Sequence, residues 1–123
     1  MNAWLMSAAG VTMATFLLHT LAGGKEVAAP LLKAQDLGPV EKYTSYYCWH
    51  MVTILLLVMA LAIGYIAWQP NLPMLLLLLC LSLAFTSLSL LMAKVSRLGI
   101  WALPQWVCFA AISGLLLAGW ARG

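Results

Sequence analysis

The chain has 123 residues, of which 65% are hydrophobic and 7% are charged, and its mean hydropathy is +1.02. A water-soluble domain needs roughly a quarter of its residues charged, so this composition excludes an ordinary soluble fold. The length fits one domain, over residues 1–123. The net charge of +3 is small, and its distribution along the chain indicates membrane topology rather than nucleic-acid binding.

Four apolar runs are long enough to span a membrane, at about residues 3–21, 46–68, 74–93 and 101–120. A hydrocarbon core of about 30 Å needs about 20 such residues. No run has Asp, Glu, Lys or Arg in its interior, and none alternates as a barrel strand does. The first run lacks the basic start and the cleavage site of a signal peptide, so we expect it to be retained. The prediction is an all-α integral membrane protein, a bundle of four transmembrane helices.

The basic residues predict the orientation of this bundle. Cytoplasmic loops are enriched in Lys and Arg, and five of the six basic residues fall in the first and third connections. These are Lys25, Lys33, Lys42, Lys94 and Arg97, while Arg122 alone lies on the other side. We therefore expect both connections in the cytoplasm and both termini outside, in a bacterial inner membrane.

The connections carry their own helix signals. Gly23 and Gly24 predict the end of the first helix. Residues 25–37 are weakly amphipathic, which predicts a short interfacial helix on the inner leaflet. Pro39 suits the first turn of the second helix, and Pro104 suits the start of the fourth.

Two histidines lie at membrane depth. His19 is 15 residues from Trp4, and His50 is 18 residues from Trp68. At 1.5 Å per residue these separations are about 22 and 27 Å, so we expect both rings near one level at the cytoplasmic end. Ionisable groups at this depth are costly and usually have a partner. We therefore expect the two rings within about 10 Å of each other, as one site.

Polar side chains at helical spacing extend this predicted site into a cleft that faces the cytoplasm. Its candidate ligand-binding residues are His19, His50, Tyr46, Tyr47, Thr15, Thr53 and Thr86. Two alternatives stay open. The hydroxyls can bond between helices or to their own backbone, and "YYCWHM" (residues 46–51) can be an aromatic anchor at the interface.

The same stretch does not form a metal-binding site. Cys48 and His50 are two residues apart, so they point to opposite faces of a helix. A haem held between His19 and His50 remains geometrically open, since two helices can supply both axial ligands. The sequence specifies no cofactor, no Ser–His–Asp set and no phosphate loop.

Three functions follow as hypotheses. The first is a binding or accessory protein that holds a lipid-like molecule, a quinone-like molecule or a partner helix in the cleft. The second is a small redox or enzymatic subunit with a cofactor such as haem at the histidines. The third is a small oligomeric transporter, which the absence of acidic residues from the spans disfavours.

Small residues repeat every fourth position at Ala110, Gly114 and Ala118, with a similar pair at Gly10 and Ala14. Such patterns let membrane helices approach closely. They predict either packing within the bundle or association into a homo-oligomer or a larger membrane complex.

A few positions resemble an uncharacterised family of small four-span membrane proteins, which includes transmembrane protein 256. The matching positions are His19 in "LLHT", Tyr46 and His50 in "YYCWHM", Pro104, and Gly119 with Trp120. The family's glycines before the first histidine are absent from "TFLLH", and Gln105-Trp106 replaces its paired glycines. The resemblance covers most of the chain. It implies a four-helix membrane fold and gives weight to the histidine pair, but it implies no activity.

Overall fold

The computed structural model describes residues 1–123, of which 85% are helical with no strand, and this confirms the all-α prediction. The elements are α1 (Ala3–Gly23), the π-helix η1 (Gly24–Ala28), α2 (Ala29–Lys33), α3 (Pro39–Trp68), α4 (Leu72–Ser96) and α5 (Gln105–Arg122). Three segments are long and apolar enough to cross a membrane: Ala3–Lys33, Pro39–Trp68 and Leu72–Ser96. They indicate a multi-pass membrane protein.

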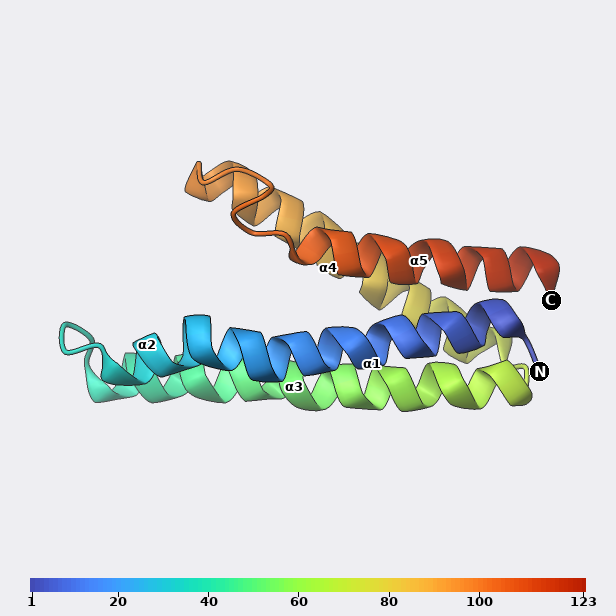
Figure 1. The fold of residues 1–123 in the computed structure, drawn as a ribbon, viewed down its shortest axis with the longest axis horizontal. Helices are drawn as coiled ribbons and strands as arrows, with labels where there is room; N and C mark the ends of the chain where they lie inside the picture. The colour runs from blue at the N-terminus through green and yellow to red at the C-terminus, as the bar shows by residue number, and fades with distance from the viewer.

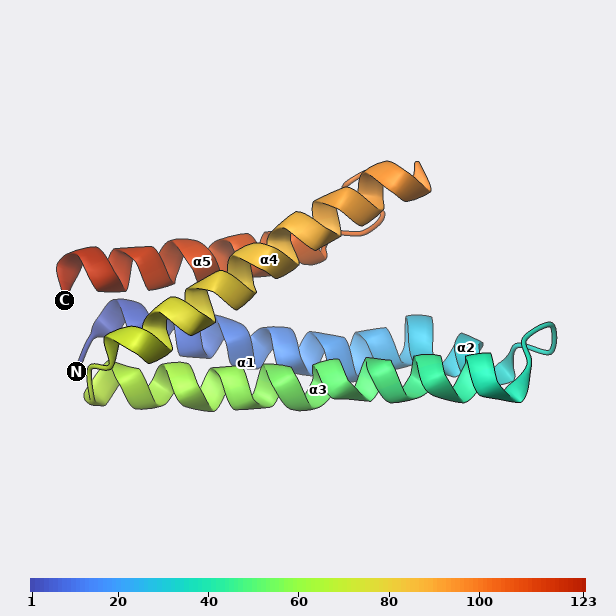
Figure 2. The ribbon, with the colours of Figure 1, turned by 180° about the vertical axis from the view of Figure 1, so that it is seen from behind.

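The long helices form two pairs (Figures 1 and 2). In both views α1 and α3 run side by side and antiparallel along their length, and α5 lies along α1. Helix α4 packs mainly on α5 and crosses the others obliquely, so it moves away from α1 and α3 as it approaches Ser96. Both termini lie at the opposite end of the bundle from Ser96.

The core lies in the half of the bundle near the termini, where all four long helices meet. Its most buried side chains are Ala8, Leu56, Met59, Ile63, Ile66, Ala67, Ile112 and Leu116, and Leu78 of α4 packs with them. Asn2 joins three helices at this end. Its backbone N–H donates to Ala67 O at 2.8 Å, and its Nδ2 donates to Gly119 O at 2.9 Å. Its Oδ1 caps the start of α1.

The first connection differs from the prediction. Gly23 and Gly24 have right-handed helical geometry, and the helix continues through η1 into α2 instead of ending there. Within η1 the Ala29 N–H donates to Gly24 O, five residues back. Pro30, which has no N–H to donate, follows directly, and a local change of helix type accommodates such a residue. The predicted separate interfacial helix is therefore the end of one helical run, and it packs against α3.

The other helix boundaries follow the proline and glycine signals more closely. Pro39 lies in the first turn of α3, as predicted. Helix α4 ends at Ser96 because Arg97 takes a left-handed conformation with φ of 60°. Residues 97–104 then form a turn, and α5 starts at Gln105 directly after Pro104.

The small residues do not lie in the interior as a bundle-packing motif requires. A Cβ added at Gly10 or Gly114 meets nothing within 4 Å, so both positions face outward. By contrast, a Cβ added at Gly119 meets the Leu5 side chain, so this glycine allows α5 to pack closely on α1.

Candidate functional site

His19 joins α1 to α3 by hydrogen bonds. Its Nε2 lies 2.9 Å from Thr53 Oγ1 and 3.1 Å from the backbone oxygen of Trp49. A carbonyl oxygen can only accept, so Nε2 carries the proton and donates in this geometry. Thr53 also donates to Trp49 O at 3.3 Å. The His19 ring is therefore held by groups from the facing helix.

Aromatic contacts surround this bond. The His19 ring stacks on Trp49 with centroids 4.3 Å apart and planes at 23°. His50 meets Trp49 edge-on at 4.8 Å and Tyr46 edge-on at 4.5 Å. On the other side of the helix contact, the Trp49 ring lies against the backbone at Gly23, where an added Cβ would make an ordinary contact with the ring at 3.7 Å. Four aromatic side chains thus form one cluster between α1 and α3.

The two imidazoles lie on the same side chain, Trp49, and not directly on each other. Their centroids are 4.3 and 4.8 Å from the Trp49 centroid, so they are separated by less than about 10 Å, the range within which sites normally couple. The cluster contains no carboxylate and no thiol. The hydrogen bonds of His19 are made to α3, so they hold α1 against α3.

The remaining predicted site residues do not form a cleft with the histidines. Thr15 donates to Val11 O, and Thr86 donates to Ser82 O, each within its own helix. Tyr47 is 66% exposed on the outer surface of α3. For Thr15 and Thr86 the structure therefore has the backbone bonds that were the alternative to a ligand site, whereas Thr53 bonds across the helix interface.

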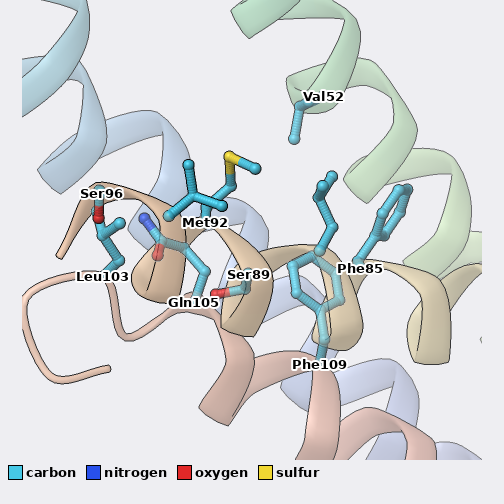
Figure 3. A pocket seen from close by; sticks show the side chains of 10 residues that line it. Val52, Phe85, Ser89, Met92, Ser96, Leu103, Gln105 and Phe109 are labelled. Atoms are coloured by element: carbon cyan, nitrogen blue, oxygen red, sulfur yellow. The ribbon is translucent and has the colours of Figure 1, made fainter. Parts of the chain in front are cut away.

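The structure has a groove elsewhere, between the diverging part of α4, the start of α5 and one position of α3 (Figure 3). Its volume is about 580 Å³ and it opens to the outside of the bundle. The lining residues are Val52, Phe85, Leu88, Ser89, Met92, Val95, Ser96, Leu103, Gln105 and Phe109. None of the seven predicted site residues lines it.

Most of the groove wall is apolar, and its three polar lining residues are Ser89, Ser96 and Gln105. Ser89 Oγ is buried and has no hydrogen-bond partner, and Figure 3 places Ser89 among the lining side chains. Most other Ser and Thr hydroxyls in the helices bond to a carbonyl one turn back, as Ser87 does to Leu83 O. A buried hydroxyl without a partner is unusual and calls for an explanation.

Side-chain hydrogen bonds join α4 to α5 at one level, beside the groove. Ser82 Oγ donates to Phe109 O at 2.9 Å, and Ser113 Oγ donates to Ser82 Oγ at 2.8 Å and to Phe109 O. Beyond this level the two helices separate, because residues 97–104 form an irregular turn instead of continuing the contact.

One sequence signal indicates this groove. The buried face of α4 comprises Leu75, Leu78, Leu79 and Ser82. Phe85, Ser89, Met92 and Ser96 continue the same face at spacings of three and four. A helix face that continues beyond the core either contacts another helix or lines an open space. The sequence does not distinguish these two cases, because the outcome depends on the angle between α4 and its neighbours.

Comparisons with models of protein families, with curated proteins and with solved structures found no match to this chain. The resemblance to the small four-span family therefore stays a prediction.

Proposed function

We propose that this protein is a four-helix membrane protein of the binding type, which holds the acyl chain of a lipid-like molecule in the groove. We place both termini outside, in a bacterial inner membrane. The observation that carries the proposal is the groove itself: about 580 Å³ of apolar space within helices of membrane-spanning length. Ligand sites are typically concave and mostly apolar, with a few polar groups.

The walls of the groove favour a hydrocarbon occupant. Seven of the ten lining residues are hydrophobic, and none is titratable. Such a surface gains nothing from a polar substrate but packs well against methylene groups. Ser89 offers one hydroxyl to an occupant that carries an acceptor. Since these walls provide no acid, base or nucleophile, we expect binding and not catalysis.

The alternatives find less support in the geometry. A haem between His19 and His50 requires an open space between the two rings, but both rings pack on the Trp49 side chain. A proton-coupled transporter usually has an ionisable group facing a cavity in the spans, but no titratable residue lines the groove and the interiors of these helices contain no acid. The binding type needs neither feature.

The fourth span and the topology need their own test. Helix α5 has 18 residues and begins and ends with polar residues, Gln105 and Arg122. We expect that single cysteines at residues 2 and 123, with the native cysteines removed, are labelled from the periplasm. A cysteine at residue 33 should stay unlabelled, and its labelling from outside would reverse the orientation.

The lipid site is tested by filling the groove. In Ser89→Phe the new ring occupies the space of the acyl chain, whereas Leu91→Phe adds the same ring on the outward surface of α4, where Leu91 is 51% exposed. Native mass spectrometry of the detergent-purified protein with added dioleoyl phosphatidylcholine or phosphatidylglycerol counts bound lipids. We expect one fewer bound lipid in Ser89→Phe and no change in Leu91→Phe. Equal binding by both variants would refute the groove as the site.

A further inference from the structure

The turn between α4 and α5, residues 97–104, exposes large apolar side chains. Trp101 is 73% exposed, and Leu98 and Ile100 are exposed as well. The Trp101 and Trp106 rings lie with their centroids 5.6 Å apart, and Trp106 Nε1 donates to Ile100 O at 3.0 Å. Apolar surface is unfavourable in water, and a patch of it on a protein surface usually marks an interaction site. Bulk water is therefore a poor environment for this turn.

The backbone of the same turn excludes the opposite environment, the hydrocarbon core. Residues 98–103 make no hydrogen bond to another backbone group. The Leu98 N–H donates to Ser96 Oγ at 3.4 Å, and Ile100 O accepts the bond from Trp106, but the other N–H and C=O groups have no partner within the protein. Irregular backbone that faces lipid does not occur in the hydrocarbon, because nothing there satisfies these groups. The turn therefore needs polar surroundings.

The length of α5 places the turn at the boundary between these two environments. Tryptophan is enriched at membrane interfaces, so Trp120, beside the chain terminus, marks one edge of a hydrocarbon core about 30 Å thick. Gln105, the first residue of α5, lies fifteen residues before Trp120, which is about 22 Å at 1.5 Å per residue. The remaining distance of about 8 Å is covered by the turn, which thus reaches the headgroups of the opposite leaflet.

The first connection, by contrast, passes beyond the headgroups. The 30 residues of α3 are about 45 Å long, which exceeds the hydrocarbon core by about 15 Å. Figures 1 and 2 show the α1–α3 pair extending past the α4–α5 turn at the same end of the bundle. All three acidic residues of the chain lie between positions 26 and 41, in this extension, and none lies in the turn. The two connections therefore lie at different depths.

From these observations we infer that the 97–104 turn is a membrane-surface anchor, whose partner is the headgroup layer of the bilayer. Water and lipid oxygens in this layer accept bonds from the free backbone N–H groups, and the amphipathic Trp101 ring is suited to it. The layer surrounds the protein, so the exposed side chains do not need to share one face. Beyond Ser82, no side-chain hydrogen bond joins α4 to another helix, so the anchor fixes the end of α4.

This inference rests on the proposed four-helix membrane arrangement and is independent of what fills the groove. The test measures depth at three nitroxide-labelled cysteines, one at a time, in protein that lacks the native cysteines and is reconstituted in phosphatidylcholine vesicles. They are Ala102→Cys in the turn, Leu83→Cys on the exposed surface of α4 and Gln35→Cys in the first connection. Oxygen collides most with labels in hydrocarbon, and a nickel chelate collides most with labels in water. We expect Leu83 to be deepest, Ala102 to be intermediate and Gln35 to lie in water.

A second variant tests the anchoring side chain. Adding Trp101→Gln to Ala102→Cys should shift the label toward water, so its collisions with the nickel chelate should increase. The matched control is Trp68→Gln, which removes a tryptophan that is 64% exposed near the opposite end of the bundle, and it should leave the label at residue 102 unchanged.

The outcomes separate this inference from the proposed arrangement of the helices. If Ala102→Cys is as accessible to the nickel chelate as Gln35→Cys, the turn lies in water, open to a protein partner, and the anchor is wrong although the four spans stand. If it is as accessible to oxygen as Leu83→Cys, the turn lies in hydrocarbon and the inference also fails. If Trp101→Gln has no effect, Trp101 does not anchor the turn. If Leu83→Cys itself lies in water, α4 does not span, and both proposals fail.

Discussion

At the end of the bundle away from the termini, α1 and α3 stay in contact, whereas α4 leaves its neighbours. The first pair is joined there by His19, whose ring bonds Thr53 and stacks on Trp49. Helix α4 carries Ser89 at a comparable distance from the core, and its hydroxyl has no partner. The His19 side chain joins two helices, whereas the Ser89 side chain lines an open groove.

The difference has a physical cause. Helices in lipid gain little from burying apolar surface against each other, so they associate through close packing and interhelical hydrogen bonds. The α1–α3 contact has both, because the Trp49 ring stacks on His19 and His19 reaches a carbonyl across the interface. Beyond Ser82, Phe85 still meets Phe109 edge-on at 5.2 Å, but the side-chain hydrogen bonds of α4 stay within the helix. A polar residue in a membrane helix is therefore a better indicator of a ligand site when its side chain has no hydrogen-bond partner within the protein.

The largest effect on stability should come from Trp49→Ala. Replacing a fully buried tryptophan costs about 3–5 kcal/mol, and Trp49 is half-buried, so we expect the free energy of unfolding to fall by about 2–3 kcal/mol. Titration with dodecyl sulfate, followed by circular dichroism, measures it. Trp68→Ala is the matched control, since Trp68 is 64% exposed, and it should change stability little. Equal losses in the two variants would mean that Trp49 is only an interfacial anchor.

A smaller loss should follow from His19→Ala, which removes one interhelical bond and one stacked ring. Interhelical bonds contribute up to about 1.7 kcal/mol and aromatic pairs about 0.5–1.5 kcal/mol, so we expect a total of about 1–2 kcal/mol. Adding Thr53→Val to His19→Ala should cost less than Thr53→Val costs alone, because the pair shares one bond.

His50→Ala provides the contrast within this cluster. The His50 ring has edge contacts with Tyr46 and Trp49 but forms none of the side-chain bonds that hold His19. We expect its replacement to cost less than that of His19 in the same dodecyl sulfate titration. A larger loss for His50 would assign the structural role to the wrong histidine.

The sequence was sufficient for the features that depend on composition and local signals. Uncharged apolar runs predicted helices in each of the four regions, Pro39 marked the start of α3, and the depth count brought His19 and His50 to one level. Gly23 and Gly24 misled, because a glycine ends a helix where it takes a left-handed conformation, and here both glycines keep right-handed helical geometry. Whether Thr15 or Thr53 finds a partner depends on helix rotation, which spacing along one helix does not determine.

The groove could not be predicted from the sequence for a related reason. Its existence depends on the angle at which α4 crosses α3, and its width on the turn 97–104. Both result from contacts between helices far apart in the chain, such as the bond of Ser82 to Phe109 O. The small residues Gly10 and Gly114 gave the same difficulty: the spacing identified a flat surface but not whether it faces inward.

The smallest effects compare two serines on one face of α4. Ser82 is fully buried and bonds to α5, so Ser82→Ala should cost about 1 kcal/mol and leave Ser113 with one partner fewer.

Ser89 is seven residues further on and has no partner to lose. Removing a buried polar group that makes no bond costs nothing and relieves desolvation. In delipidated protein, Ser89→Ala should therefore leave the free energy of unfolding unchanged or raise it slightly. With phosphatidylglycerol added, the sign should reverse, because the hydroxyl then has an acceptor and its loss weakens lipid binding. A loss of stability in Ser89→Ala without lipid, equal to that in Ser82→Ala, would mean that Ser89 bonds within the protein and is not free to bond a lipid.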